Sequence, residues 1–337
     1  MSQLDTQPQL IDRFGRHVTY VRMSITDRCD FRCVYCMDEE MTFMPREQLL
    51  TLEEIVFLLR AFCELGVENV RITGGEPLIR RNVDWLFEQV GALKQSTALK
   101  ELNITTNGSQ LPKYADSMAK SGVDRINISL DSLKAERFRE LTRTGDLNTV
   151  LAGIEAAKQA GFKLIKLNAV IMKGRNDDEI VELAQFAIDN ELDISYIEEM
   201  PLGHVSHQRD ESYCSSDEVR AILQQAFELT SSNIQTGGPS HYYRVAGSKS
   251  KIGFISPHSH NFCESCNRVR VTTEGRLLLC LGQEHSVDLR AIIRQHPDNI
   301  ELLKQAIIDS MAIKPKGHDF NLKEEPIIFR HMSVTGG

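Results

Sequence analysis

Residues 18–37 read VTYVRMSITDRCDFRCVYCM and join a predicted strand, over 19–26, directly to three closely spaced cysteines. Apolar and polar side chains alternate along the strand, so Val21 faces one side while Arg22 faces the other. The cysteines follow at positions 29, 33 and 36. A strand that carries three thiols past its carboxyl end indicates chemistry at that rim of a parallel sheet or barrel.

Five more predicted strands alternate with helical segments as far as Met200. The strands are expected over 69–73, 102–106, 125–130, 164–171 and 194–200, and the helices over 51–65, 82–93, 111–120, 147–160 and 178–190. This alternation predicts βαβ units with parallel pairing. Six units are too few for the eight-unit barrel, which leaves a partial, open barrel and a doubly wound sheet as alternatives.

The polar residues within these strands favour the barrel. Fully buried parallel strands usually read as continuous apolar runs, but here one face of each strand is polar. The polar pairs are Arg71 with Thr73, Asn103 with Thr105, Asn127 with Ser129, and Lys166 with Asn168. An antiparallel sheet wetted on one face would alternate too, but the intervening helices oppose it. We expect an α/β fold, a partial (β/α)6 barrel whose polar lumen holds a large hydrophilic ligand.

The pattern changes after Met200. A helix is expected to begin near Ser215, a hairpin to form from 241–245 and 251–256, and another helix to cover 299–312. We therefore divide the chain into a barrel core, 1–205, and a smaller C-terminal α+β region, 206–337.

Composition excludes several classes of protein. The 337 residues include 39 Lys and Arg against 47 Asp and Glu, a net charge of −8. The basic excess of a dedicated nucleic-acid-binding protein is therefore absent, although a few converging cations could still bind an anionic small molecule. No apolar run approaches the ~18 residues of a membrane-spanning helix, and the polar N-terminus lacks a signal-peptide core. We expect a soluble, cytoplasmic protein.

Six of the eight cysteines form two groups of three, and tight groups in a long chain predict metal binding rather than a disulfide framework. Cys29, Cys33 and Cys36 can bind three irons of a [4Fe–4S] cluster, for which four cysteines are usual. Structural zinc is the alternative, but it requires four N or S ligands. A cluster with one open iron therefore fits better. Cys63 and Cys214 are expected to have no metal-binding role.

The second strand ends in Gly74-Gly75-Glu76-Pro77, one βα unit after the cysteine loop and on the same rim. Paired glycines allow close approach to the backbone, and Glu76 offers an acceptor for an ammonium group. A plain turn is the alternative for this motif taken alone.

Together with Tyr35, the three cysteines and the Gly-Gly-Glu-Pro motif resemble those of the radical S-adenosylmethionine (SAM) enzymes. The resemblance implies that the amino and carboxylate groups of SAM chelate the open iron. One electron from the reduced cluster would then split the S–C5′ bond and produce a 5′-deoxyadenosyl radical.

Motifs in the C-terminal region resemble those of one particular family of radical SAM enzymes. FCESCNRVR, over 262–270, is followed by Cys280, and the chain ends in Gly336-Gly337. With the barrel motifs, these features are similar over nearly the whole chain to the GTP 3′,8-cyclases of molybdenum cofactor biosynthesis. That family implies a second [4Fe–4S] cluster held by Cys263, Cys266 and Cys280.

The resemblance also implies roles for individual residues. Those expected at SAM are Tyr35, Gly74, Gly75, Glu76, Ser129 and Met200. Those expected at GTP are Arg22, Arg71, Thr105, Lys166, Arg268, Val269 and Arg270. Arg268 and Arg270, with the Gly336-Gly337 tail, would assist the radical step. Family members carry Arg at the position of Ser195, so one substrate contact is missing here or is made by another cation.

The implied reaction begins when the radical removes hydrogen from C3′ of GTP. C3′ then adds to C8 of guanine, and one electron and one proton complete (8S)-3′,8-cyclo-7,8-dihydroguanosine 5′-triphosphate. The implied partners are a flavodoxin or ferredoxin as electron donor, the downstream cyclic pyranopterin monophosphate synthase, and a second copy in a homodimer.

Two other functions compete with this one. The first is a peptide-modifying radical SAM enzyme with an auxiliary cluster, but such an enzyme has no need for the phosphate-binding Arg268 and Arg270. The second is a zinc-stapled binding module, which a brown colour in protein purified without air would exclude.

Overall fold

The computed structural model describes residues 9–234, 236–322 and 328–336. They form one curved sheet of 12 strands in the order β12-β11-β10-β1-β2-β3-β4-β5-β6-β9-β8-β7. Its parallel centre consists of β1 (Tyr20–Ser24), β2 (Asn69–Thr73), β3 (Glu101–Thr106), β4 (Arg125–Ser129), β5 (Ile165–Ile171) and β6 (Asp193–Glu198). The predicted partial (β/α)6 barrel is confirmed.

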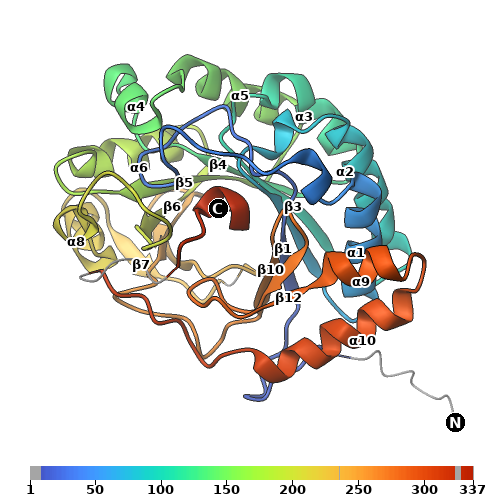
Figure 1. Cartoon of the computed structure of the whole chain (residues 1–337). Coiled ribbons are helices and arrows are strands. Elements are labelled where there is room, and N and C mark those ends of the chain that lie inside the picture. Colours follow the sequence, from blue (N-terminus) through green and yellow to red (C-terminus); the bar gives the residue numbers. More distant parts are fainter. Residues whose placement is uncertain (1–8, 235, 323–327, 337) are drawn as a thin grey trace, which may run out of the picture.

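Helices cover the outside of this sheet (Figure 1). They are α1 (Leu52–Glu64), α2 (Val83–Ala92), α3 (Leu111–Lys120), α4 (Ala135–Thr142), α5 (Leu147–Gln159) and α6 (Ile180–Asp189). The capping box expected at the start of α1 is present, since Thr51 and Glu54 bond to each other's backbone N–H groups. α4 was not among the helices expected from the sequence.

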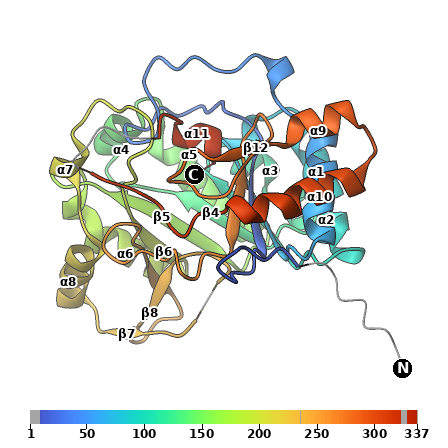
Figure 2. The same cartoon turned by 60° about the horizontal axis from the view of Figure 1, so that its bottom comes forward.

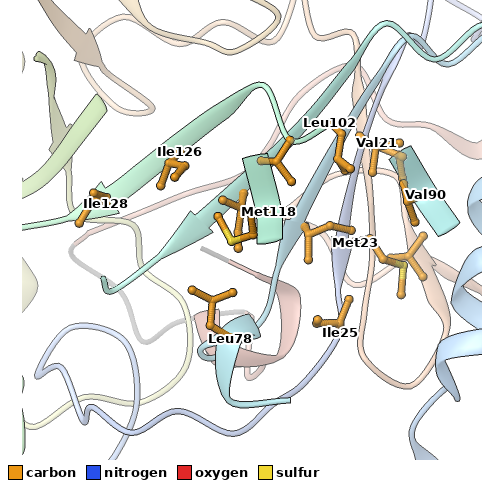
Figure 3. Packing of buried hydrophobic residues seen from close by; sticks show 14 of the residues in the cluster. Val21, Met23, Ile25, Leu78, Val90, Leu102, Met118, Ile126 and Ile128 are labelled. Carbon is orange, nitrogen blue, oxygen red and sulfur yellow. The ribbon is translucent and has the colours of Figure 1, made fainter. Parts of the chain in front are cut away.

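The apolar faces of the strands form the core between sheet and helices (Figure 3). Val21 and Met23 of β1 are fully buried, as are Leu102 of β3 and Ile126 of β4. Met118 of α3 packs against them (Figure 3). Since neighbouring side chains alternate, the polar residues between these positions must face the lumen.

The C-terminal residues extend both edges of the same sheet. Beyond β6 lie β9 (Lys251–Ile255), β8 (His241–Val245) and β7 (Leu229–Ser231), of which β8 and β9 form the expected hairpin. Beyond β1 lie β10 (Arg268–Val271), β11 (Arg276–Leu278) and β12 (Ser286–Asp288). The parallel pairing of β10 with β1 was not expected from the sequence.

The remaining helices lie at the edges and in the mouth of the barrel. They are α7 (Arg209–Ser212), α8 (Ser216–Ala226), α9 (Leu289–Gln295), α10 (Ile300–Ser310) and α11 (Met332–Thr335). α10 packs beside α1, and α11 brings the C-terminus into the centre of the ring (Figure 1). Figure 2 shows the segment between β1 and α1, which carries the first cysteines, arching over one end of the barrel. Within the described parts of the chain, no helix has the length and apolarity to cross a membrane.

Gly153 allows α5 to pack closely against the loop after β3. A β-carbon at this position would collide with the carbonyl oxygen of Gly108. Gly108 follows Asn107, which lines the site described below. Close packing here therefore fixes the position of a functional loop.

We expect Gly153→Ala to lower the free energy of unfolding by about 1–3 kcal/mol, as overpacking does, although alanine favours helices by about 1 kcal/mol. Urea denaturation would measure the change. Ala152→Gly, at the exposed neighbouring position in α5, measures the difference in helix propensity between alanine and glycine without adding a contact. A Gly153→Ala protein more stable than the parent would contradict this packing.

Candidate active site

Two cavities occupy the lumen and meet at four shared residues. The first opens at the carboxyl rim of the strands and is lined by Cys29, Cys33 and Cys36. The second is lined by Cys263, Cys266 and Cys280. The residues that line both are Asn168, Ile197, Met200 and Met332. A group bound in one cavity therefore lies next to a group bound in the other.

The turn between α4 and α5 holds the first cysteine loop. Arg143 Nη1 donates hydrogen bonds to the carbonyl oxygens of Arg32 and Met37, both at 3.2 Å. Thr144 Oγ1 donates to the Asp30 carbonyl at 2.7 Å. These contacts fix the loop backbone, so the three thiols are oriented by groups that the sequence analysis did not single out.

The first three thiols are partly buried and face carboxylates. All three are free of disulfides. Burial raises the pKa of Cys36 to about 12. Burial, together with Glu76, raises the pKa of Cys29, and burial, together with Cys36 and Asp131, raises that of Cys33. A bound cationic metal group would offset this cost of holding thiolates.

The Gly-Gly-Glu-Pro segment packs directly on the cysteine loop. Gly75 N donates to the Thr26 carbonyl at 2.7 Å, and Glu76 N donates to the Arg28 carbonyl at 2.8 Å. A β-carbon at Gly75 would collide with the Arg28 carbonyl. The glycines are thus needed for contact with the cysteine loop, in addition to any approach by a ligand.

Glu76 is fully buried, and protein donors occupy its carboxylate. Oε1 accepts from Thr106 Oγ1 at 2.8 Å and Leu78 N at 2.9 Å, and Oε2 accepts from Asn107 N at 2.7 Å. The side chain does not line the cavity. Glu76 therefore holds the rim together, and its expected bond to an ammonium group stays a prediction.

The other residues expected at SAM converge on the first cavity. Tyr35, Gly74, Gly75, Ser129 and Met200 all line it. Tyr35 Oη donates to Asp131 Oδ2 at 2.7 Å, and Asp131 Oδ1 accepts from Val170 N at 2.8 Å. Burial raises the pKa of Asp131 to about 6. Asp131 was not predicted from the sequence, although it lies two residues after Ser129 and so continues the same polar face of the chain.

The second cavity gathers the expected cations. Within the described residues its lining includes Arg22, Arg71, Arg125, Lys166, Arg268 and Arg270, and it includes no carboxylate. Val269 also lines it, whereas Thr105 lines the first cavity, with its Oγ1 3.5 Å from Arg71 Nη1. Burial and the neighbouring Arg268 lower the pKa of Arg270 to about 10. This concentration of positive charge matches a polyanionic ligand.

Arg125 is a cavity residue that the sequence analysis missed. It stands two residues before Asn127 on β4, and Asn103 pairs with it in register. The same period-two alternation that identified Asn127 and Ser129 could have found it. Its buried Nε has no hydrogen-bond partner among the described residues.

The C-terminal tail reaches both cavities. Arg270 Nη1 donates to the Gly336 carbonyl, and a β-carbon at Gly336 would collide with Thr73 Oγ1. Met332 lines both cavities. The expected tail residue Gly337 lies outside the described residues.

Ser195 lies on the lumen side of the β6 register, between Asn168 and Gly253. It is fully buried, and its Oγ lies 2.9 Å from Ser240 Oγ. It does not line either cavity. Ser195 therefore makes a polar contact within the sheet, and the expected loss of one substrate contact at this position stays a prediction.

The second set of thiols lies among cations. Although burial alone would raise it, the charges of Lys314 and Arg268 lower the pKa of Cys266. Among the described residues, no three His, Cys, Asp or Glu side chains are grouped to hold a single metal ion.

Comparison with known proteins shows which family models and which named proteins this chain is similar to. A model described as Radical SAM superfamily matches residues 23–187, and one described as Molybdenum Cofactor Synthesis C matches residues 192–320. GTP 3′,8-cyclase of Saccharophagus degradans is 60% identical over 97% of this chain and 98% of its own. That of Marinobacter nauticus is 57% identical over 98% of this chain and 99% of its own.

Solved structures show the same fold at low sequence identity. Streptococcus suis SuiB bound to S-adenosylmethionine has a TM-score of 0.59 and 17% identity, covering 96% of this chain and 79% of its own. This likeness bears on the fold alone.

We expect Glu76→Gln to flatten the pH dependence of stability. Burial raises the pKa of Glu76 from 4.5 to about 8, so the folded chain retains a proton that the unfolded chain has released. The free energy of unfolding should therefore fall as pH rises between these values, by up to about 1.4 kcal/mol per pH unit.

Urea denaturation at several pH values would measure how the free energy of unfolding changes with pH in the parent and in Glu76→Gln. Glu68→Gln makes the same change at a surface ion pair with Lys100 and should leave the slope unaltered. Parallel slopes for the parent and Glu76→Gln would contradict the prediction.

Proposed function

The chain belongs to the GTP 3′,8-cyclase family of radical SAM enzymes, and we propose that it converts GTP to (8S)-3′,8-cyclo-7,8-dihydroguanosine 5′-triphosphate. This reaction is the first step of molybdenum cofactor biosynthesis. The observation that carries the proposal is the second cavity, with its six Arg and Lys side chains and no carboxylate among the described residues. It adjoins the cavity of the radical SAM motif.

The donor sets fit the cofactors of the family, which are SAM and two [4Fe–4S] clusters. Each set offers three thiols to one cavity, and all six are free of disulfides. Phe31 N donates to Cys29 Sγ at 3.3 Å, the kind of bond that tunes cluster sulfurs. When bound, the first cluster and SAM supply the 5′-deoxyadenosyl radical that removes the C3′ hydrogen.

The protein's own residues bind and orient the nucleotide. Guanidinium groups bind phosphate oxygens in pairs, so Arg71, Arg268 and Arg270 would hold the triphosphate together with Arg22 and Lys166. Met200 and Met332 form apolar walls where the two cavities meet. They would exclude water and limit side reactions where hydrogen is transferred. Arg270 also holds the tail by the Gly336 carbonyl.

A peptide-modifying reaction is not favoured. The similar fold of SuiB bound to its precursor peptide SuiA, at 16% identity, bears on fold alone. A peptide substrate gives no reason for six cations in a cavity whose described lining holds no carboxylate.

We extend the proposal to the organisation of the chain and its partners. Residues 1–205 would form the radical SAM core and 206–337 the substrate region. A flavodoxin or ferredoxin would supply electrons, cyclic pyranopterin monophosphate synthase would take the product, and two copies would form a homodimer. The eight cysteines, none of them in a disulfide, support a reducing, cytoplasmic location.

GTP deuterated at C3′ tests the reaction directly. The anaerobically reconstituted chain, given SAM, dithionite and this GTP, should produce 5′-deoxyadenosine that carries one added deuterium, measured by mass spectrometry. GTP deuterated at C2′ is the matched control and should transfer none. Unlabelled 5′-deoxyadenosine, formed equally without GTP, would remove GTP as the substrate and favour the peptide reaction.

We expect Arg125→Gln to raise KM for GTP roughly 10- to 100-fold, because a hydrogen bond to a charged group is worth about 1.5–3 kcal/mol. The value of kcat should change little, since the contact is to the bound nucleotide in both ground and transition states. Arg139→Gln, at an exposed position on α4, is the control. A KM equal to that of the parent would show that Arg125 does not touch the substrate.

A further inference from the structure

Lys314 carries a buried ammonium group at the second set of cysteines. It follows a short 3₁₀ helix, Met311–Ile313, and its side chain is 1% exposed. Nζ lies 2.6 Å from the Leu279 carbonyl oxygen, 3.0 Å from that of Arg268, and 3.8 Å from Cys266 Sγ. Nothing in the sequence motifs singled out this residue.

The three contacts indicate a protonated amine. An ammonium group has three donors and no acceptor, and Nζ meets three acceptors: two carbonyl oxygens and a sulfur. None of these is a carboxylate. The nearby carboxylate of Asp12 is bound by Arg16 Nε at 2.6 Å. The charge of Lys314 is therefore directed at the cysteine segment and is not neutralised there by a carboxylate contact.

Lys314 also joins the two parts of this cysteine set. Leu279 directly precedes Cys280, and Arg268 lies two residues after Cys266. On the third cysteine, Arg16 Nη1 donates to the Cys263 carbonyl at 2.7 Å and to the Lys316 carbonyl at 2.8 Å. Two cations from distant parts of the sequence thus contact all three cysteine segments.

The first cysteine set differs in that carboxylates lie beside its thiols, while Arg32 and Arg143 donate to backbone carbonyl oxygens of its loop. Asp30 follows Cys29 directly, Asn107 Nδ2 bonds both Cys29 Sγ and the Asp30 carboxylate, and Asp131 lines the same cavity. The second cavity has no carboxylate in its described lining. Reduction adds one negative charge to a cluster, and a nearby positive charge in a low-dielectric site stabilises that charge.

We propose that Lys314 raises the reduction potential of the cluster held by Cys263, Cys266 and Cys280, so that this cluster is reduced more readily than the one held by Cys29, Cys33 and Cys36. The proposal rests on the proposed function only in that both cysteine sets hold [4Fe–4S] clusters. Lys314 acts here as a positioning and electrostatic residue, since it contacts the segments that carry the ligands and no substrate group.

The test measures one cluster at a time in the full chain. Substituting Cys29, Cys33 and Cys36 by Ala leaves the second cluster alone, and the protein is reconstituted without air. Titration with dithionite and redox mediators, followed by electron paramagnetic resonance of the reduced cluster, gives its midpoint potential. The complementary chain, with Cys263, Cys266 and Cys280 changed to Ala, gives the potential of the first cluster, which should be lower.

Lys314→Gln keeps a donor for the carbonyl oxygens but removes the charge. We expect the equilibrium constant for reduction to fall at least tenfold, which is about 59 mV for a one-electron couple. Lys314→Arg keeps the charge, so the midpoint potential of its cluster should stay near that of the parent. Lys316→Gln makes the same change two residues away at an exposed position and should have no effect.

Several outcomes would overturn the proposal. One is an unchanged potential in Lys314→Gln, and another is a first cluster that is reduced more readily than the second. A third is a folded Lys314→Gln protein that binds no iron, which would assign Lys314 to cluster assembly alone. Because no GTP or SAM is present, failure of the labelled-GTP experiment would leave this measurement intact.

Discussion

The parallel register at the centre of the sheet is the constraint on which the site depends. Side chains at paired positions of parallel strands point to the same face, and Arg22 of β1 pairs with Arg71 of β2 on one side and with Arg270 of β10 on the other. Three guanidinium groups are therefore aligned across neighbouring strands. Val21 and Met23, which flank Arg22 along β1, are fully buried on the opposite face of the sheet. The packing of such apolar residues stabilises a sheet that must hold like charges together.

The lumen built in this way has two electrostatic halves. At the rim, Asp131 is buried beside the first thiols and lines their cavity, while deeper in the barrel the second cavity carries cations without carboxylates in its described lining. A cationic sulfonium cofactor suits the first half and a triphosphate suits the second. Asn168, Ile197, Met200 and Met332 are shared by both, so the reacting atoms would meet at a boundary that is mostly apolar.

Local patterns in the sequence were enough to predict the barrel strands, their polar faces and the cysteine sets, because period-two alternation and short motif spacing are properties of adjacent residues. They could not predict which strands close the sheet. The pairing of β10 with β1 joins Arg270 to Arg22 across 248 positions of chain. Lys314 was missed for the same reason, since its contacts with Cys266 and Leu279 arise only from tertiary packing.

Ser195 shows how the same register limits what a strand can carry. On β6 it is paired with Gly253 of β9, where a β-carbon would lie 2.7 Å from Ser195 Oγ and would collide with Ser240 Oγ. The hairpin therefore packs directly on this position, and a longer side chain at 195 would have to displace Ser240 or Tyr242, whose Oη lies 3.4 Å from Lys166 Nζ. Arg125, two strands away on β4 and also facing the lumen, reaches the cavity without that conflict. A lumen-facing cation on this side of the barrel therefore comes from β4, because the packing of the hairpin on β6 leaves room only for a short side chain at 195.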